Sequence, residues 1–308
     1  MLRQIVEISE EGRILLSKRG AISVNFQKNE VGLIPFEDVA VLLVTARGAT
    51  LSKETLVRLN EHGGIAILCG KNYAPVSYVF PHSSHYNYTG RLYDQIESSK
   101  PLNKQIWRSI VKEKIRNQAQ LLYYYGKPES GHLKKLADTV TSGDKENREA
   151  HAARIYWPSL LGEDFRRDVK MPGTNALLNY GYGVLRGITA RAVCSAGLEP
   201  ALGIHHRSRV NNFCLVDDLM EPFRPIFDIA AVELTKKQEL ELTPEVKRKI
   251  IQLSWLDLES KKGNAPLVRA ADYMMQSLIL SFKEKKNLLE IPKIPGNEVI
   301  SELVQTCF

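Results

Sequence analysis

Residues 81–90, PHSSHYNYTG, separate two parts of the sequence that have different hydrophobic patterns. The segment is polar and is bounded by Pro81 and Gly90, which is typical of a connection between folded units. We therefore predict a linker at 81–90, a first domain at 1–80 and a second domain at 91–308. A chain of 308 residues is long enough for two such domains.

The part before the linker contains short runs of Val, Ile and Leu separated by Gly, Asn, Lys and Glu, a pattern that favours strands. The predicted strands are RQIVEI, RILLS, AISVNF, EVGLIPF, DVAVLLV, IAILC and VSYVF. One helix is predicted within LSKETLVRLNEHGG at 51–64. Ser52 is suited to cap its first turn, and Gly63 is suited to follow its last turn.

Beyond the linker the apolar residues recur with a helical period. The longest pattern spans 101–126, where Pro101 suits the first turn. Further helices are predicted at 130–142, 146–161, 174–197, 210–235, 243–259 and 264–284. The charged, proline-containing segment after these helices is predicted to be a loosely held tail. The fold class is therefore α+β, with a small β-rich N-terminal domain followed by a larger all-α C-terminal domain.

The balance of charge favours a polyanionic partner. The chain has 42 Lys and Arg against 35 Asp and Glu, a net charge of +7. Basic residues cluster in the middle third of the chain, where they can contact phosphates. The candidate nucleic-acid contacts are Arg154, Arg166, Arg167, Lys170, Arg207 and Arg209.

The sequence also indicates a compartment. It has no uninterrupted apolar run long enough to span a membrane and no apolar leader pattern at its start. Its four cysteines are widely spaced and form no CxxC pair, which favours free thiols in a reducing environment. We expect a cytoplasmic protein.

Glu149 lies in REAHAARIYW, within one of the predicted helices. It shares a helix face with Ala152, Ala153 and Tyr156, so its carboxylate is expected to point where the apolar residues point. A buried carboxylate needs a compensating positive charge, and a divalent cation is one such charge. An acid near a helix N-terminus can also simply stabilise the first turn, and this position alone does not separate the two interpretations.

Two adjacent histidines, His205 and His206, lie in GIHHRSR, a predicted loop. Neighbouring side chains in an extended segment point in opposite directions. At most one of the two is therefore expected to face a site, while the other packs or contacts phosphate. Which of the two faces the site stays open at this point.

The stretch VDDLMEPFRP contains three acids. Glu221 is spaced to share a helix face with either Asp217 or Asp218. Arg224, three residues beyond, can neutralise Glu221 in a salt bridge, which is the purely structural alternative. Pro222 predicts a kinked or broken helix here.

Glu149, His206 and Glu221 together supply two carboxylates and one imidazole. Mg²⁺ or Mn²⁺ suits such a set better than Zn²⁺ does, and a metal held this way supports phosphodiester chemistry. Two other functions remain open. One is a non-catalytic nucleic-acid scaffold whose acids are salt-bridged to nearby arginines, and the other is a general metal-dependent nuclease.

The order of a β-rich lobe, a linker and a helical lobe, with NREAHAARIYWPSLLG, NALLNYGYGVLRG, GIHHRSRVNNF and LVDDLMEPFRP, resembles the Cas1 family of CRISPR spacer-acquisition integrases over nearly the whole chain. The segments QIWRSIVKEKIRNQAQLL and DDLMEPFRP resemble the branch that accompanies type II systems. The resemblance implies that Glu149, His206 and Glu221 are the metal-binding catalytic residues. It also implies that Asp218 is a supporting acid.

The resemblance further implies the activity and the assembly. Such an enzyme joins the 3′-hydroxyl ends of captured double-stranded DNA fragments to the CRISPR repeat by metal-dependent transesterification. The family forms homodimers, usually through the β-rich lobe, and a small companion subunit, Cas2, bridges two dimers. A type II branch would add the effector nuclease as a further partner.

Overall fold

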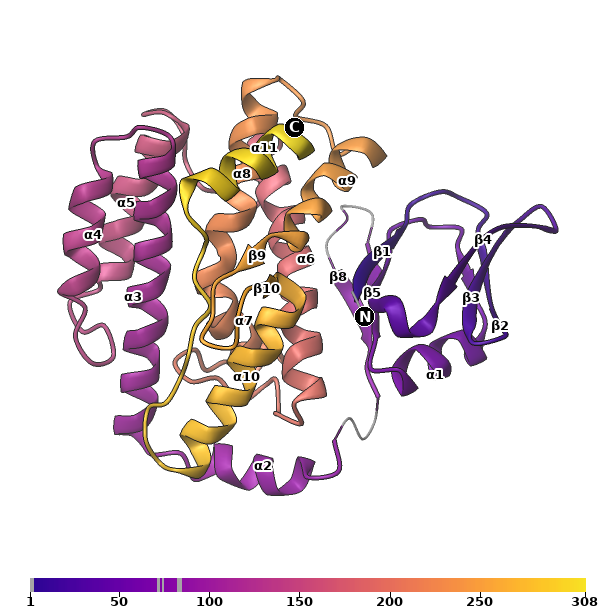
Figure 1. Ribbon diagram of the computed structural model, residues 1–308, viewed down its shortest axis with the longest axis horizontal. Helices are drawn as coiled ribbons and strands as arrows, with labels where there is room; N and C mark the ends of the chain where they lie inside the picture. Colours follow the sequence, from indigo (N-terminus) through magenta and orange to yellow (C-terminus); the bar gives the residue numbers. More distant parts are fainter. Residues whose placement is uncertain (1–2, 71–72, 74, 82–84) are drawn as a thin grey trace.

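The computed structural model describes residues 3–70, 73, 75–81 and 85–308. Strands dominate the N-terminal part and helices dominate the rest, so the predicted α+β class is confirmed (Figure 1). Residues 82–84 of the predicted linker lie outside the described residues, and helix α2 (Tyr88–Ile96) already begins in the linker's last part. The exact domain boundaries stay a prediction.

The N-terminal strands form two four-stranded sheets. The first sheet has the order β1 (Gln4–Ile8), β5 (Val39–Val44), β7 (Ile65–Cys69) and β8 (Pro75–Val79). Its first three strands are parallel, and β8 is antiparallel to β7. The second sheet has the order β4 (Asn29–Pro35), β3 (Ala21–Phe26), β2 (Ile14–Lys18) and β6 (Thr50–Leu51).

Two short helical elements accompany these sheets, a 3₁₀ turn η1 (Phe36–Asp38) and helix α1 (Lys53–Glu61). The predicted cap of α1 is confirmed, because the Ser52 side chain accepts a hydrogen bond from the Thr55 amide at 3.1 Å. Gly63 follows the helix with φ +74°, a backbone conformation that glycine adopts without strain.

The C-terminal part is a bundle of helices around α6 (Figure 1). Its α-helices are α3 (Lys100–Tyr124), α4 (Ser130–Asp138), α5 (Arg148–Leu161), α6 (Thr174–Ser195), α7 (Cys214–Met220), α8 (Arg224–Lys236), α9 (Pro244–Gln252), α10 (Leu267–Lys283) and α11 (Asn297–Cys307). Its shorter elements are η2 (Glu221–Phe223), η3 (Leu253–Trp255) and the paired two-residue strands β9 (Asp257–Leu258) and β10 (Ala265–Pro266). Within the described part of the chain, no helix is long and apolar enough to cross a membrane.

Two predicted helices and the predicted tail need correction. The segment predicted as one helix at 210–235 is α7, η2 and α8 in succession, with the break that Pro222 predicts. The helix predicted at 243–259 ends with α9 at Gln252 and continues as η3 and strand β9, which pairs with β10. The tail after α10 is not loosely held: it pairs with the Glu259 backbone through Lys293 and then forms α11, in which Ile300 is fully buried. The apolar residues of this segment are few, but in α11 their helical spacing places them on one face that packs against the bundle.

The first sheet is covered on both faces. One face packs against the second sheet and α1, in a core that includes Leu15, Ile22, Leu42, Val44 and Leu59. The other face belongs to the core of the helical domain, to which it contributes Ile5, Val41, Leu43, Ile65 and Ile67. A Cβ atom on Gly187 of α6 would lie 2.3 Å from Ile67 Cδ1, so this glycine permits the helix to approach the sheet. One core therefore crosses the predicted domain boundary.

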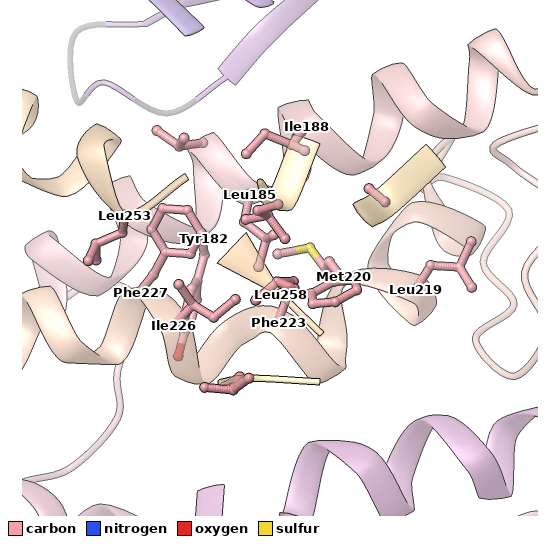
Figure 2. Close-up of a cluster of buried hydrophobic side chains, with 14 of the residues drawn as sticks. Tyr182, Leu185, Ile188, Leu219, Met220, Phe223, Ile226, Phe227, Leu253 and Leu258 are labelled. Carbon is pink, nitrogen blue, oxygen red and sulfur yellow. The ribbon is translucent and has the colours of Figure 1, made fainter. Parts of the chain in front are cut away.

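Within the helical domain, α6 packs against α7 and α8, and buried side chains of η2 belong to the same core (Figure 2). The close-up labels Tyr182 and Leu185 of α6 together with Met220, Phe223 and Phe227 of the following elements. Close packing of this kind fixes the backbone on which the candidate site is built.

Candidate active site

Lys114 of α3 lies between two of the predicted site acids. Its Nζ is 2.6 Å from Oε1 of Glu149, in the first turn of α5, and 2.5 Å from Oε2 of Glu221, in η2. Burial alone would lower the pKa of Lys114, but the two carboxylates outweigh it and raise the pKa. The fold thus brings Glu149 and Glu221 together around one ammonium group.

The Asp144 side chain stabilises the first turn of α5. Asp144 accepts hydrogen bonds from the backbone amides of Arg148 at 2.8 Å and Glu149 at 3.1 Å, which satisfies two of the free donors at the helix start. The Glu149 carboxylate is therefore left to reach Lys114 on another helix. Glu149 does lie in the first turn, as the alternative interpretation required, but its side chain forms a tertiary contact.

Glu221 is placed by the break between α7 and α8. The Asn117 side chain of α3 donates a buried hydrogen bond of 2.8 Å to the carbonyl of Pro222. Arg224 Nε lies 2.9 Å from Glu221 Oε1, so the predicted salt bridge is present. Burial would raise the pKa of Glu221, but Lys114 and Arg224 outweigh it and lower the pKa, which keeps this buried carboxylate ionised.

Asp218, which is fully buried on α7, organises the histidine loop. Its carboxylate accepts the backbone amides of His205 at 2.8 Å and His206 at 3.3 Å, and it lies 2.5 Å from His206 Nδ1. A Cβ on Gly203 would clash with the His206 carbonyl at 2.1 Å, so the loop needs glycine there to close around Asp218. The hydrogen bond that His206 Nδ1 makes to the Asp218 carboxylate raises the pKa of His206.

The two histidines have different surroundings. His206 uses Nδ1 for Asp218, which leaves Nε2 as the ring nitrogen able to bind a ligand, the usual arrangement of a metal-binding histidine. His205 stacks on the buried indole of Trp107, with ring centres 4.3 Å apart and planes 3° apart. His205 is thus the packing member of the pair, and His206 lies with Glu221 on the wall of one cavity.

Asp217 and Asp218 are also distinguished by their partners. Asp217 binds Arg186 through both carboxylate oxygens, at 2.7 and 2.9 Å, and accepts a further hydrogen bond from Asn211. Asp217 therefore orients an arginine, whereas Asp218 orients a histidine.

Nothing in the described residues forms a group of three or more His, Cys, Asp and Glu side chains placed closely enough to hold a metal ion. Lys114 takes the position between the two carboxylates instead. The donor set nevertheless suits Mg²⁺ or Mn²⁺. Glu221 Oε2 is buried and has a cation nearby without a hydrogen bond of good geometry, and His206 has Nε2 available.

A cavity of about 550 Å³ opens beside these groups. Four arginines line it together with His206 and Glu221, and they are Arg167, Arg186, Arg207 and Arg224. The predicted contacts Arg167 and Arg207 therefore lie beside the candidate site. Arg167 donates to Asn175 at 3.0 Å and to Asn179 at 2.7 Å, so its orientation is fixed.

The other predicted nucleic-acid contacts do not line this cavity. Each of them is exposed, and they are Arg154, Arg166, Lys170 and Arg209. Arg166 donates to the backbone carbonyls of Glu163 and Phe165, which directs its guanidinium toward its own loop.

A fully buried acid, Asp228, supports the arginine side of the cavity. It accepts hydrogen bonds from Tyr156 at 2.7 Å and Tyr182 at 2.6 Å, and burial raises its pKa to about 6. The ring of Tyr182 in turn lies 4.6 Å from the guanidinium carbon of Arg224 and 5.4 Å from that of Arg167. Asp228 thus fixes an aromatic platform under two cations.

Sequence reasoning missed Lys114, Asn117 and Asp228. Lys114 had a visible signal, because it interrupts an otherwise apolar face of α3 at helical spacing from Ile110 and Val111. The other two residues are polar groups in buried helices whose partners come from distant parts of the chain, and no local pattern identifies those partners.

Comparison with known proteins identifies the family of this chain. The family model described as CRISPR associated protein Cas1 matches residues 6–254. A protein of Neisseria meningitidis named CRISPR-associated endonuclease Cas1 is 34% identical over 291 residues, which cover 93% of this chain and 95% of that protein.

Solved structures share the fold. A casposase bound to integration product superimposes with a TM-score of 0.76 at 18% identity, covering 98% of this chain and 99% of that one. A Cas6-RT-Cas1–Cas2 complex gives a TM-score of 0.74 at 18% identity, covering 92% of this chain and 35% of that one.

These comparisons first define a class, the CRISPR-associated endonucleases. Within that class, the chain belongs to the CRISPR-associated Cas1 family. The resemblance to the Cas1 family is confirmed, while the type II branch and the residue roles that the resemblance implies stay predictions.

Proposed function

We propose that this protein joins the 3′-hydroxyl ends of double-stranded DNA fragments to a CRISPR repeat by metal-dependent transesterification. The observation that carries the proposal is the convergence of Glu149 and Glu221 on one cation, Lys114, beside a cavity that His206 and four arginines line. Paired acids that hold a cation next to phosphate-binding groups suit phosphodiester chemistry.

Each residue has a role in this proposal. Glu149, His206 and Glu221 would hold Mg²⁺ or Mn²⁺, which when bound polarises a phosphate oxygen and stabilises developing negative charge. Asp218 holds the His206 ring so that Nε2 faces outward. Arg167 and Arg207 bind the phosphates of the DNA.

The reaction itself exchanges one phosphodiester for another. The fragment's 3′-hydroxyl oxygen forms the new bond to phosphorus, and the bond from that phosphorus to the repeat's own 3′-oxygen breaks. The proton of the attacking hydroxyl passes to solvent, and the leaving 3′-oxygen gains one. The nucleophile belongs to DNA, so the chemistry needs no covalent intermediate with the protein.

The proposed assembly is a homodimer in the cytoplasm, with two dimers bridged by a Cas2 subunit. The solved complex that contains Cas1 and Cas2 supports this partner, because its Cas1 part has the same fold. The likeness of α3 and α7 to the type II branch supports the effector nuclease as a further partner.

The first test is strand transfer. Labelled double-stranded DNA with free 3′-hydroxyl ends, a repeat-containing target, the Cas2 subunit and Mg²⁺ or Mn²⁺ are combined with wild-type protein or Glu149→Ala. We expect joined product from the wild type and a loss of at least about 100-fold in the variant, since several kcal/mol of charge stabilisation disappear. Glu163→Ala, which removes an exposed acid just after α5, should retain wild-type joining.

The alternatives give different products. A non-catalytic scaffold would bind DNA in both proteins and form no joined product with or without metal. A general nuclease would hydrolyse the DNA in a metal-dependent way and join nothing. Either outcome would refute the proposed integration.

A further inference from the structure

Each carboxylate oxygen of Glu221 contacts a cationic side chain. Its Oε1 lies 2.9 Å from Arg224 Nε, and its Oε2 lies 2.5 Å from Lys114 Nζ. Glu149 shares the same ammonium through Oε1 at 2.6 Å. A divalent cation that uses both carboxylates therefore competes with at least one of the two cationic side chains on Glu221.

Arg224 is the less mobile of these two cations. It follows Glu221 by one helical turn, and the ring of Tyr182 lies 4.6 Å from its guanidinium carbon. Asp228 anchors that ring through the Tyr182 hydroxyl at 2.6 Å. Movement of Arg224 away from Glu221 would disrupt the buried network that Arg224 forms with Tyr182 and the fully buried Asp228.

Lys114 is held differently. The described contacts of its ammonium are to Glu149 and Glu221, the two candidate ligands themselves. Its side chain is 13% exposed, and its four-carbon stem has several rotatable bonds, so the ammonium has a route away from the acids. A divalent cation between the same carboxylates would repel a neighbouring ammonium strongly in this partly buried site.

We propose that Lys114 is a positioning residue that occupies the divalent-cation position in the metal-free protein and moves away when the cation binds. The proposal rests on the metal site proposed above. Without a cation, two carboxylates this close together repel each other, and burying them uncompensated is costly. Lys114 keeps them together and ready to bind, and the metal must compete with it for the same oxygens.

The test is Mn²⁺ binding to the full-length protein without DNA, followed by the electron paramagnetic resonance signal of free Mn²⁺. Lys114→Met keeps the length of the side chain but removes the competing charge. We expect it to bind Mn²⁺ about 5- to 150-fold more tightly than wild type, the usual range for coupling between two linked binding events. Lys112→Met, on the same helix but paired with Asp138, should bind like wild type.

Thermal unfolding gives a second readout. In EDTA, Lys114→Met should unfold at a lower temperature than wild type, because two acids lose their shared counter-ion. Added Mn²⁺ should raise its unfolding temperature by more than it raises that of wild type. If Lys114→Met does not fold in EDTA, Lys114→Gln, which still donates hydrogen bonds but carries no charge, is titrated with the same expectation.

Unchanged or weaker Mn²⁺ binding in the Lys114 variants would overturn the inference, since it would mean that the lysine supports the bound metal or does not compete with it. Failure of the underlying metal site looks different. In that case wild type and Glu149→Gln would give the same Mn²⁺ titration, with no tight site in either.

Discussion

Lys114 shows what a single residue pattern can and cannot reveal. Its place on the buried face of α3, four residues after Ile110 and three after Val111, marks it as an anomaly in the sequence. A lysine at such a position needs an acidic partner, but Glu149 is 35 residues away in sequence and Glu221 is 107 away. The anomaly was predictable, whereas its two partners depend on tertiary structure.

For the neighbouring acids Asp217 and Asp218, too, the tertiary structure decides in which direction each side chain points. Successive residues on a helix project about 100° apart, so one of the two had to face the histidine loop and the other had to face elsewhere. The rotation of α7 about its axis could not be predicted from the residue pattern alone, because the residues before this helix form an irregular loop. The hydrogen bonds that the Asp218 carboxylate accepts from His205 and His206 show that Asp218 is the acid that faces the histidine loop.

Asp228 should make stability depend on pH. Burial raises its pKa in the folded protein to about 6, above the ordinary value of 3.8. Its contribution is therefore fully present below the ordinary pKa and is lost as pH rises through about 6. Between pH 5 and pH 7 the free energy of unfolding of the wild type should fall by about 1 kcal/mol relative to that of Asp228→Asn, which does not titrate.

Urea unfolding of both proteins at several pH values between 5 and 7 measures this difference. Asp164→Asn, at an exposed loop position, should keep the wild-type profile. Parallel profiles for wild type and Asp228→Asn would contradict the assigned shift.

Among the elements, long periodic helices were the most predictable. The pattern at 101–126 corresponds to α3 and the pattern at 146–161 corresponds to α5, because each has an apolar face. The break at Pro222 was predicted from proline chemistry alone. Helix α11 was missed because the segment before it is charged and proline-containing, which hid a short apolar face that packs against the bundle.

The break between α7 and α8 has its own test. Asn117→Ala removes the donor to the Pro222 carbonyl and leaves that buried acceptor without a partner. We expect a loss of about 1–3 kcal/mol in the free energy of unfolding, and weaker Mn²⁺ binding because Glu221 shifts with η2.

Gln105→Ala, at an exposed position on the same helix, should change stability by less than about 0.5 kcal/mol. Chemical denaturation with the Mn²⁺ titration checks both variants. An Asn117→Ala protein as stable as Gln105→Ala would show that the break does not depend on this hydrogen bond.

At the scale of the whole molecule, the second sheet bears on the proposed homodimer. Leu16 and Leu33 both lie opposite Ser23 in the strand register, so they share the outer face of this sheet, and both are exposed together with Ile14. If this face is the dimer contact, Leu16→Glu combined with Leu33→Glu should convert the dimer to a monomer.

Size-exclusion chromatography with light scattering measures the mass of each protein. Val57→Glu, which changes another exposed apolar residue on α1, should leave the dimer intact. A dimer that survives the double substitution, or a wild type that is monomeric at micromolar concentration, would argue against this face.

The sequence also predicted two successive domains but not the core that they share. Alternation in a strand indicates which residues are buried, but it does not identify what covers them. Strands β5 and β7 are nearly continuous apolar runs, because the second sheet covers one face and α6 covers the other.

The shared sheet has a consequence for how the protein is made. A ribosome synthesises β1, β5 and β7 long before it reaches Gly187 and the rest of α6, about ten seconds later at ordinary elongation rates. During that interval the apolar residues of the helix-facing side have nothing to pack against. We therefore expect chaperones to bind the nascent N-terminal segment. This segment completes its folding only when the centre of the chain has left the ribosome.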